Sequence, residues 1–239
     1  EMSASLVGSE MCIRDSHNVV ASIKGTKYPD EYVIISGHLD SYDVATGGID
    51  CGTGIGPMME AARMIALSGA KPKRTILFVA FAGEEFGLLG AKSYVKTHAK
   101  ELGKIANLFN RDGGPTPPVG ISVPQAMYDD FVEVCKPVKE IRADYPFEVK
   151  VAKPFKRPTQ SGGTDASVFA VEGVPTFGFN TQDIKGYNFS YGEIWHTERD
   201  LYTKNIPEYQ EHAATVTAVV ALGIANLSKQ LSREGMHKK

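Results

Sequence analysis

The chain has 239 residues, 42% of them hydrophobic, and a formal net charge of −2 at pH 7. A chain of this length can bury a sizeable core in one domain, and neither an internal repeat nor a linker divides it. The mixed charges and the lack of a basic run argue against nucleic acid as a partner. No apolar run approaches the ~18 residues of a transmembrane helix, and three cysteines make a disulfide framework improbable.

The first 16 residues show neither helical nor strand periodicity. Residues 5–16 also resemble the translated sequencing-adapter read-through that contaminates some assembled genomes. We therefore treat residues 1–16 as a non-native or disordered segment and assign residues 17–239 to one domain. On this hypothesis a native N-terminal part, including any signal peptide, would be missing.

Predicted strands and helices alternate in the first half of this domain. Apolar runs of strand length predict strands at 18–25, 31–37, 75–82 and 105–110. Apolar residues at helical spacing predict helices at 57–68 and at about 88–98. This alternation favours an α/β domain with helices on both faces of a sheet.

The second half is less regular. Its pattern predicts a loop at 115–118, a helix at 125–136, and strands at 147–151 and 174–179. Residues 153–163 are polar and rich in proline and glycine, which is typical of a mobile loop at the mouth of a site.

Two further helices are expected in the second half. Thr164 and Asp165 are placed to cap a short helix that runs through Ala170. The last helix is expected from about residue 205 to 231, with Pro207 in its first turn. Its apolar stripe consists of Ala213, Val216, Val220, Ile224, Leu227 and Leu231.

Acidic residues and histidines follow the predicted strands. Glu84 and Glu85 come directly after strand 75–82, whose composition is typical of a strand buried on both faces. A buried carboxylate is costly unless it is paired, hydrogen-bonded or bound to a metal. An isolated Glu-Glu pair lies more often in a solvated turn, but this chain has similar residues at other strand ends or in the loops after them. These are His38, Asp50, Asp112 and His196.

The carboxyl ends of strands are where open α/β sheets bind ligands. Imidazole and carboxylate groups are ordinary zinc ligands, and a catalytic zinc site leaves a position for water. Each residue alone has a simpler explanation: a histidine after a strand is more often hydrogen-bonded, and an aspartate in a glycine-rich loop usually serves the turn. All six together favour a pair of divalent metals.

The six residues lie in five motifs that span residues 38–200. With these motifs the chain resembles the co-catalytic dizinc exopeptidases that include bacterial leucyl aminopeptidases and plasma glutamate carboxypeptidase, and the similarity is collinear from about residue 17 to 231. The resemblance implies a metallopeptidase catalytic domain at 17–239, two Zn²⁺ ions per chain and a peptide substrate. The implied fold is a three-layer α/β/α sandwich around a mixed, mostly parallel central sheet. The motifs are Gly37-His38-Leu39-Asp40-Ser41, Gly48-Ile49-Asp50-Cys51-Gly52-Thr53-Gly54, Gly83-Glu84-Glu85-Phe86-Gly87, Asn110-Arg111-Asp112 and His196-Thr197-Glu198-Arg199-Asp200.

The resemblance also implies a role for each metal ligand. His38 and Asp112 would bind one zinc, Glu85 and His196 would bind the other, and Asp50 would bridge both. A carboxylate between two cations is stabilised by both, and a water that they share is acidified.

Two neighbouring acidic residues would support this centre. Glu84 would be the general base that takes a proton from the shared water and delivers it to the leaving amine. Asp40 is placed either to accept the second N–H of His38 or to cap the strand end. In relatives the peptide bond after the bridging aspartate is cis, so we predict a cis bond between Asp50 and Cys51.

The chain departs from the family pattern at two positions. Cys51 stands where relatives often have Asp or Asn, and Trp195 stands where some relatives have a tyrosine that stabilises the oxyanion. Tyr191 or Tyr187 can supply that hydroxyl, although such tyrosines more often serve packing.

A Ser/Thr-Asp pair lies near the site in the family, and Thr164-Asp165 matches it, with helix capping as the alternative role. Aminopeptidase activity is our first hypothesis, and glutamate-carboxypeptidase-like or dipeptidase activity is the second. Glutaminyl cyclases, which are transferases with this fold, use one zinc, whereas His38 and Asp112 make a second site. Receptor-like relatives have lost ligands that this chain keeps. The resemblance further suggests a secreted or periplasmic protein in which a lid or protease-associated domain can precede residue 17.

Overall fold

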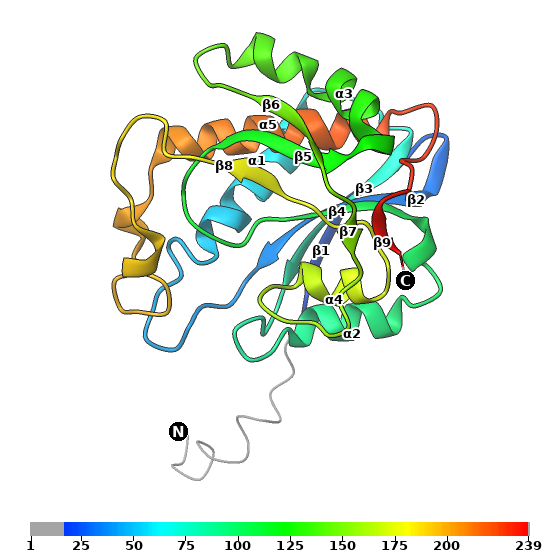
Figure 1. The fold of residues 1–239 in the computed structure, drawn as a ribbon. Helices are drawn as coiled ribbons and strands as arrows, with labels where there is room; N and C mark the ends of the chain where they lie inside the picture. Colours follow the sequence, from blue (N-terminus) through cyan, green and yellow to red (C-terminus); the bar gives the residue numbers. More distant parts are fainter. Residues whose placement is uncertain (1–16, 239) are drawn as a thin grey trace.

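The computed structural model describes residues 17–238, so the predicted non-native segment at 1–16 lies outside the described residues. A four-stranded sheet in the order β1-β3-β2-β4 forms the centre of the domain (Figure 1). Strand β2 is parallel to both β3 and β4, whereas β1 is antiparallel to β3, which confirms a mixed, mostly parallel sheet. The strands are β1 (Val19–Ile23), β2 (Tyr28–His38), β3 (Arg74–Phe81) and β4 (Ile105–Asn110).

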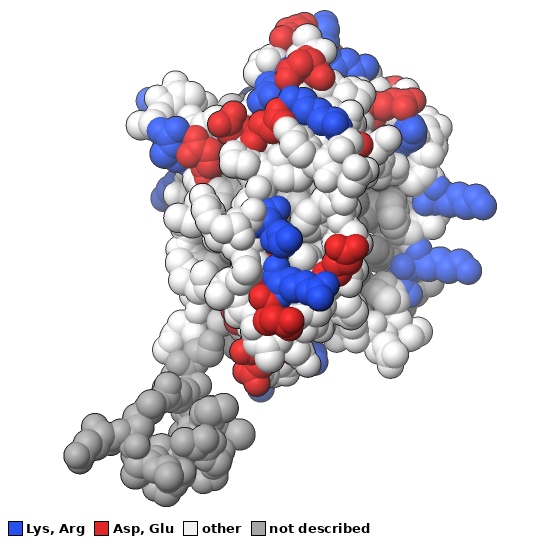
Figure 2. Space-filling view, turned by 90° about the vertical axis from the view of Figure 1, so that its left-hand side faces the viewer, with Lys and Arg blue, Asp and Glu red and all other residues white. Residues whose placement is uncertain are grey.

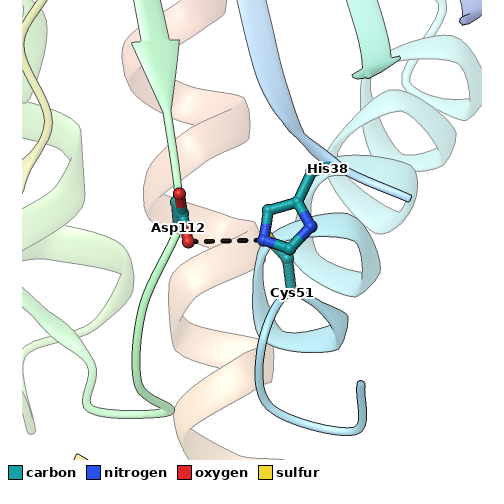
Figure 3. Close-up of side chains that lie close together, drawn as sticks. All are labelled: His38, Cys51 and Asp112. Carbon is teal, nitrogen blue, oxygen red and sulfur yellow. Dashed lines mark ion pairs between the residues drawn. The ribbon is translucent and has the colours of Figure 1, made fainter. Parts of the chain in front are cut away.

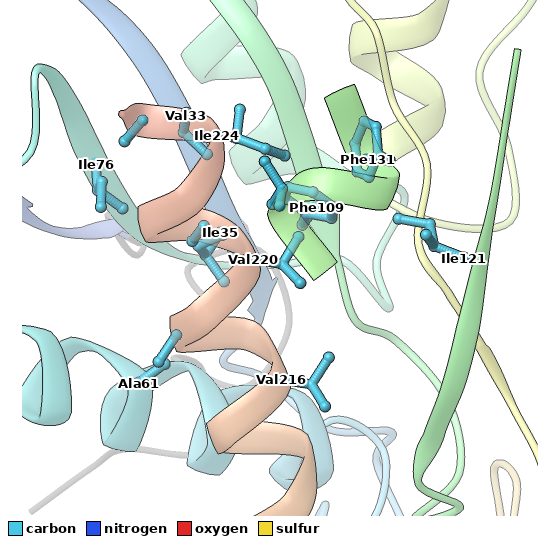
Figure 4. Packing of buried hydrophobic residues seen from close by; sticks show 14 of the residues in the cluster. Val33, Ile35, Ala61, Ile76, Phe109, Ile121, Phe131, Val216, Val220 and Ile224 are labelled. Atoms are coloured by element: carbon cyan, nitrogen blue, oxygen red, sulfur yellow. The ribbon is translucent and has the colours of Figure 1, made fainter. Parts of the chain in front are cut away.

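Helices cover both faces of this sheet (Figure 1). Helices α1 (Gly52–Leu67) and α5 (Pro207–Ala225) pack on one face, and α2 (Leu89–Thr97) and α4 (Ala166–Val171) on the other. Because side chains alternate along a strand, Val33 and Ile35 pack with the first pair of helices and Ile34 with the second. Figure 4 shows part of the first cluster, with residues of β2, β3 and α5 in one continuous core. The three-layer α/β/α fold is therefore confirmed.

A second, smaller sheet extends the domain. Its strands β6 (Glu148–Ala152), β5 (Pro118–Pro124) and β8 (Phe179–Thr181) lie in the order β6-β5-β8, next to helix α3 (Tyr128–Ile141). Strand β5 is not predicted from the sequence, because prolines bound its short apolar run and Gly120 interrupts it. A two-stranded sheet joins β7 (Phe155–Lys156) to β9 (Met236–Lys238). Short 3₁₀ helices complete the described elements: η3 (Leu102–Lys104), η4 (Gln125–Met127), η5 (Tyr191–Glu193) and η6 (Tyr202–Lys204).

Two predicted elements differ from the structure. The strand expected at 174–179 is reduced to an isolated parallel bridge between Leu108 and Thr176, followed by β8. Pro175 has no N–H to donate, so its carbonyl alone bonds, to the N–H of Leu108. The last helix ends at Ala225 rather than near residue 231. The side chain of Asn226, the next residue, instead accepts a hydrogen bond from the N–H of Lys73 at 3.1 Å.

The surface shows no large region of a single charge in the view of Figure 2, where acidic and basic side chains are interspersed. Among the helices of residues 17–238, none is both long and apolar enough to span a membrane.

Candidate metal centre

The predicted site residues meet at one edge of the central sheet. Strands β2, β3 and β4 are parallel, so their carboxyl ends lie side by side. His38 closes β2, Glu84 and Glu85 follow β3, and Asp112 follows β4. Two loops complete the cluster. One carries Asp50 just before α1, and the other carries His196 just after η5.

His38 lies at the centre of this cluster. Its Nε2 is 2.9 Å from Oδ1 of Asp50 and 3.4 Å from Oδ1 of Asp112, and Figure 3 shows the second of these pairs. Its Nδ1 is 2.9 Å from the main-chain carbonyl of Asp40, to which only an N–H can bond. Nδ1 therefore carries a proton, and Nε2 faces two carboxylates. Burial alone would lower the pKa of His38, but these carboxylates raise it well above its usual range.

Of the two roles considered for the Asp40 side chain, the contacts agree with the strand-end cap rather than with the acceptor of the second His38 N–H. Its carboxylate is 3.8 Å from Nδ1 of His38, so the main-chain carbonyl of Asp40, and not its side chain, orients the imidazole. The carboxylate instead accepts the N–H groups of Glu84 at 3.0 Å and Glu85 at 3.1 Å. One side chain thus holds the backbone of both glutamates at the end of β3.

Glu85 and His196 form the other half of the cluster. Oε2 of Glu85 is 2.9 Å from Nε2 of His196, while its buried Oε1 has no hydrogen-bond partner within residues 17–238. The His196 ring lies between two aromatic rings, that of Tyr42 at 4.2 Å and that of Trp195 at 4.1 Å between centroids. Trp195, where some relatives have tyrosine, therefore packs against the predicted ligand.

The loop that carries Asp50 is held by hydrogen bonds to Asp200 and Tyr191, which lie far along the sequence. The carboxylate of Asp200, which is 1% exposed, accepts the N–H groups of Ile49 at 2.7 Å and Asp50 at 3.2 Å. The Tyr191 hydroxyl donates to Oδ2 of Asp50 at 2.8 Å. The bond between Asp50 and Cys51 is cis, as predicted. The position of Asp200 in the fifth motif was the signal that could have identified it.

Cys51 and Arg111 shape the other side of the cluster. The Cys51 thiol donates to the Arg111 carbonyl at 3.0 Å, near His38 and Asp112 (Figure 3), and burial raises its pKa. The half-buried Arg111 guanidinium donates to main-chain carbonyls, among them that of Thr53 at 2.8 Å. This arrangement ties the turn that carries Asp112 to the start of α1.

Glu84, which is half-buried, and Asp165, which is buried, are acidic groups beside the predicted ligands. Burial, reinforced by the charge of Asp112, raises the pKa of Glu84 to about 8. Asp165 is fully buried, and neither carboxylate oxygen has a hydrogen-bond partner among the described residues. Asp165 is the N-cap residue of α4, as predicted, but its side chain makes no capping hydrogen bond. Burial, with Asp112 and Asp40 nearby, raises the pKa of Asp165 to about 7.

Thr164 and Tyr187 have partners of their own. The Thr164 hydroxyl accepts a hydrogen bond from the Asn110 amide at 2.6 Å, at the end of β4. The Tyr187 hydroxyl donates to Glu208 at the start of α5, and its side chain is 54% exposed. The structure therefore places Tyr191, but not Tyr187, against the cluster.

These residues fit a divalent metal. The ligand atoms of His38, Asp50 and Glu85 lie within 4.8 Å of one another, and those of His38, Cys51 and Asp112 form a second such group. Carboxylates that face an imidazole Nε2, with one buried carboxylate oxygen left unpartnered, are suited to a cation between them. Carboxylate and imidazole together are suited to zinc.

A cavity of about 330 Å³ opens beside the cluster. Its walls come from the ends of β3 and β4, the start of α2, the loop at 161–163 and the loop before His196. Residues 161–163 belong to the segment predicted to lie at the mouth of a site.

The raised pKa values of Glu84 and Asp165 lead to a prediction about the stability of the metal-free protein. Glu84 and Asp165 have pKa values of about 8 and 7, against 4.5 and 3.8 for the free side chains. The folded protein therefore binds more protons than the unfolded chain up to pH 8, and its free energy of unfolding should fall as pH rises. Burial lowers the pKa of His212 from 6.5 to about 4. Below pH 6.5 this histidine therefore makes the free energy of unfolding rise with pH. The fall should thus be clearest from about pH 6.5 to 8.

Urea unfolding in chelator at pH 6.5, 7 and 8 measures this dependence. Glu84→Gln and Asp165→Asn should each make the slope shallower, because each removes a group that must ionise in the folded state. A free energy of unfolding that rises through this pH range in all three proteins would contradict the prediction.

The contacts of Asp200 lead to a second prediction. Asp200→Asn leaves one acceptor oxygen for two N–H groups, so it should weaken zinc binding by ~10–100-fold, as expected for a group that orients a ligand. It should also destabilise the fold by about 1–3 kcal/mol, the cost of a buried unpaired donor. Zinc titration and urea unfolding measure both effects. The exposed Glu198 of the same motif provides the control Glu198→Gln, and equal zinc affinity in the two variants would refute the role of Asp200.

The fold and the cluster together define a three-layer α/β domain with a cluster of histidines and carboxylates suited to a metal at the carboxyl edge of its sheet. A family model described as Peptidase family M28 matches residues 18–220. The chain belongs to this family.

Individual relatives agree with this assignment. The chain is 33% identical to Carboxypeptidase Q of Rattus norvegicus over 219 residues, which are 92% of this chain and 43% of that protein. The structure of a Peptidase M28 precursor from Shewanella amazonensis matches with a TM-score of 0.75 at 33% sequence identity. The match covers 90% of this chain and 46% of that protein. BSAP, a zinc aminopeptidase from Bacillus subtilis, shares the fold, with a TM-score of 0.66 at 21% identity. That match covers 92% of this chain and 53% of BSAP. The chain thus spans less than half the length of the curated relative.

Proposed function

We propose that this domain is the catalytic domain of a zinc-dependent exopeptidase, with aminopeptidase activity as the first choice. The observation that carries the proposal is the cluster of His38, Asp50 and Glu85, joined by Asp112 and His196, at the carboxyl edge of the sheet. Membership in Peptidase family M28 supports peptide hydrolysis. The relatives described as a zinc aminopeptidase and as Carboxypeptidase Q support zinc and exopeptidase activity.

In this proposal each zinc has its own pair of ligands. His38 and Asp112 hold one ion, Glu85 and His196 hold the other, and Asp50 lies between them. The contacts support this division, because Nε2 of His38 faces Asp112 and Nε2 of His196 faces Glu85. Bound zinc would supply an acidified water and a Lewis acid for the scissile carbonyl.

Glu84 is the proposed general base. Asp40 holds the backbone N–H of Glu84 together with that of the proposed ligand Glu85, so the two side chains start from fixed backbone positions at the end of β3. In the metal-free cluster its pKa is about 8, and nearby cations would lower that pKa and leave the carboxylate ionised at neutral pH. An ionised Glu84 can accept a proton and then transfer it to the leaving amine.

Three further residues, Tyr191, Asp165 and Thr164, are proposed to support substrate binding. The Tyr191 hydroxyl lies at Asp50 among the proposed ligands, and it would be free to donate to the oxyanion once bound zinc replaced it as the partner of Asp50. The unpartnered carboxylate of Asp165 suits the amino group of a peptide or another donor that the chain itself does not provide. Thr164 is proposed to position Asn110 at the end of β4, because its hydroxyl accepts a hydrogen bond from the Asn110 amide.

Metal analysis together with hydrolysis assays tests the proposal. The expected result is two zinc ions per chain and cleavage of aminoacyl-anilides in preference to substrates that report release of the C-terminal residue. A single zinc would favour a glutaminyl cyclase-like transferase instead. A zinc-loaded protein that cleaves neither type of substrate would refute exopeptidase activity.

A carboxypeptidase or dipeptidase is the second candidate. The 33% identity to Carboxypeptidase Q over 92% of this chain favours it. Preferential release of the C-terminal residue in the same assay would establish it in place of aminopeptidase activity.

A further inference from the structure

A cysteine lies inside the cluster of proposed metal ligands. Cys51 follows Asp50 in the sequence and is 2% exposed. Its Sγ, one ring nitrogen of His38 and one carboxylate oxygen of Asp112 all lie within 4.8 Å of one another. Figure 3 shows Cys51 beside the edge of the His38 ring that faces Asp112. The three side chains therefore form a group of a size that one metal ion can bridge.

The surrounding backbone keeps the sulfur of Cys51 at this place. A Cβ atom on Gly54 would lie 2.5 Å from Sγ, and one on Gly37 would lie 3.2 Å from it, so glycine at both positions leaves room for the sulfur. The thiol donates to the main-chain carbonyl of Arg111 at 3.0 Å. Because Arg111 precedes Asp112 in the chain, this hydrogen bond holds Sγ beside a proposed ligand.

Unpartnered buried oxygens point to a cation at the same cluster. The side chain of Glu85 is 3% exposed, and its Oε1 has no hydrogen-bond partner within residues 17–238. The same is true of both carboxylate oxygens of Asp165, which is fully buried and within range of the charges of His38 and Asp112. Buried carboxylates of this kind are stabilised by a bound metal. This observation does not involve the cysteine, so it supports a metal beside Cys51 independently.

We propose that Cys51 is a ligand of the zinc ion that the proposed function assigns to His38 and Asp112. The inference rests on that function and adds a residue to its metal centre. Cysteine, histidine and aspartate are all ordinary zinc ligands. On binding, a zinc–sulfur bond replaces the S–H bond of Cys51, and the thiol proton leaves to solvent.

The two zinc ions then differ in their ligands. Cys51 and the shared Asp50 give the ion at His38 four protein ligands, which is typical of a closed zinc site. The ion at Glu85 and His196 has three, counting Asp50, and three ligands leave a position for water or substrate. The ion at His38 is therefore the more tightly held, and the other ion is the one open to the substrate.

Replacement of zinc by Co²⁺ tests this ligand by spectroscopy. The Co²⁺-loaded full chain should show a sulfur-to-cobalt charge-transfer band in the near ultraviolet, with the amplitude of one cobalt–sulfur bond per chain. Cys51→Ser should abolish the band and weaken one zinc site by at least the ~10–100-fold that loss of a ligand-orienting group costs. Cys135→Ser is the matched control, because Cys135 is 1% exposed on α3, outside both groups of ligand atoms. This control should keep the band and the zinc affinity. All the proteins carry Cys12→Ser, which removes the third thiol of the chain.

X-ray absorption of the zinc-loaded protein with Cys51 intact provides a readout that does not depend on how the variants fold. It should show sulfur at about 2.3 Å from zinc. Two bound metal ions without a metal–sulfur signal would overturn the inference and leave the proposed function standing, and so would a band that Cys51→Ser retains. A chain that takes up no metal would refute both. A metal–sulfur signal without peptide hydrolysis by the zinc-loaded protein would refute the proposed activity and leave Cys51 as a ligand.

Discussion

Glu84→Gln is expected to keep both zinc ions and to lower turnover by ~10²–10⁴-fold, the usual contribution of a positioned general base. The substitution removes a proton acceptor but no metal ligand, and the N–H of residue 84 can still bond to Asp40. Zinc analysis and steady-state kinetics on the same preparation measure both quantities. A large loss of turnover at unchanged zinc content would show that Glu84 acts as a base and not as a metal ligand.

Glu85→Gln provides the matched comparison, since it changes the neighbouring side chain in the same chemical way. Glu85 faces His196 at 2.9 Å, so this variant should lose one zinc ion and regain part of its activity at high zinc concentration. Its stability should also fall more than that of Glu84→Gln, because a metal that binds only the folded state stabilises that state. The roles would be reversed if Glu84→Gln lost one zinc and Glu85→Gln kept both.

Removal of zinc by a chelator is expected to abolish activity and to lower the thermal midpoint of unfolding. At a free metal concentration ~1,000 times Kd, one site contributes about 4 kcal/mol. With roughly 2–4 °C per kcal/mol for a domain of this size, the midpoint should fall by about 8–16 °C for each site. The physical reason is that the buried carboxylates around His38 lose the cations between them. Calorimetry with chelator, and again after zinc is restored, measures the change.

Asp50→Asn serves as the control for this experiment. Because Asp50 is the proposed bridging ligand, the variant should bind zinc weakly, start from a lower midpoint and respond little to the chelator. An unmutated protein that keeps its midpoint after analysis shows its zinc to be gone would contradict a stabilising role for the metal.

The sequence alone determined the central sheet and the residues at its edge. Strands β2, β3 and β4 each contain a mostly apolar stretch, and such stretches are detectable from the residues within them. Once these strands are parallel, their carboxyl ends must lie side by side, which brings His38, Glu85 and Asp112 together. The prediction failed where local signals were weak. β5 is bounded by prolines and was not predicted, and Pro175 leaves a single bridge in place of a strand.

Only the tertiary structure decided which side chains hold the cluster in place. Asp200 and Tyr191 reach Asp50 across 150 and 141 residues of sequence, and no local pattern reports contacts of that separation. The same applies to Asp40, whose carboxylate bonds to the backbone of Glu84 and Glu85 rather than to the imidazole two residues away. The physical reason is that periodicity reports which face of an element is buried, whereas hydrogen-bond partners depend on how separate loops pack at the end of the sheet.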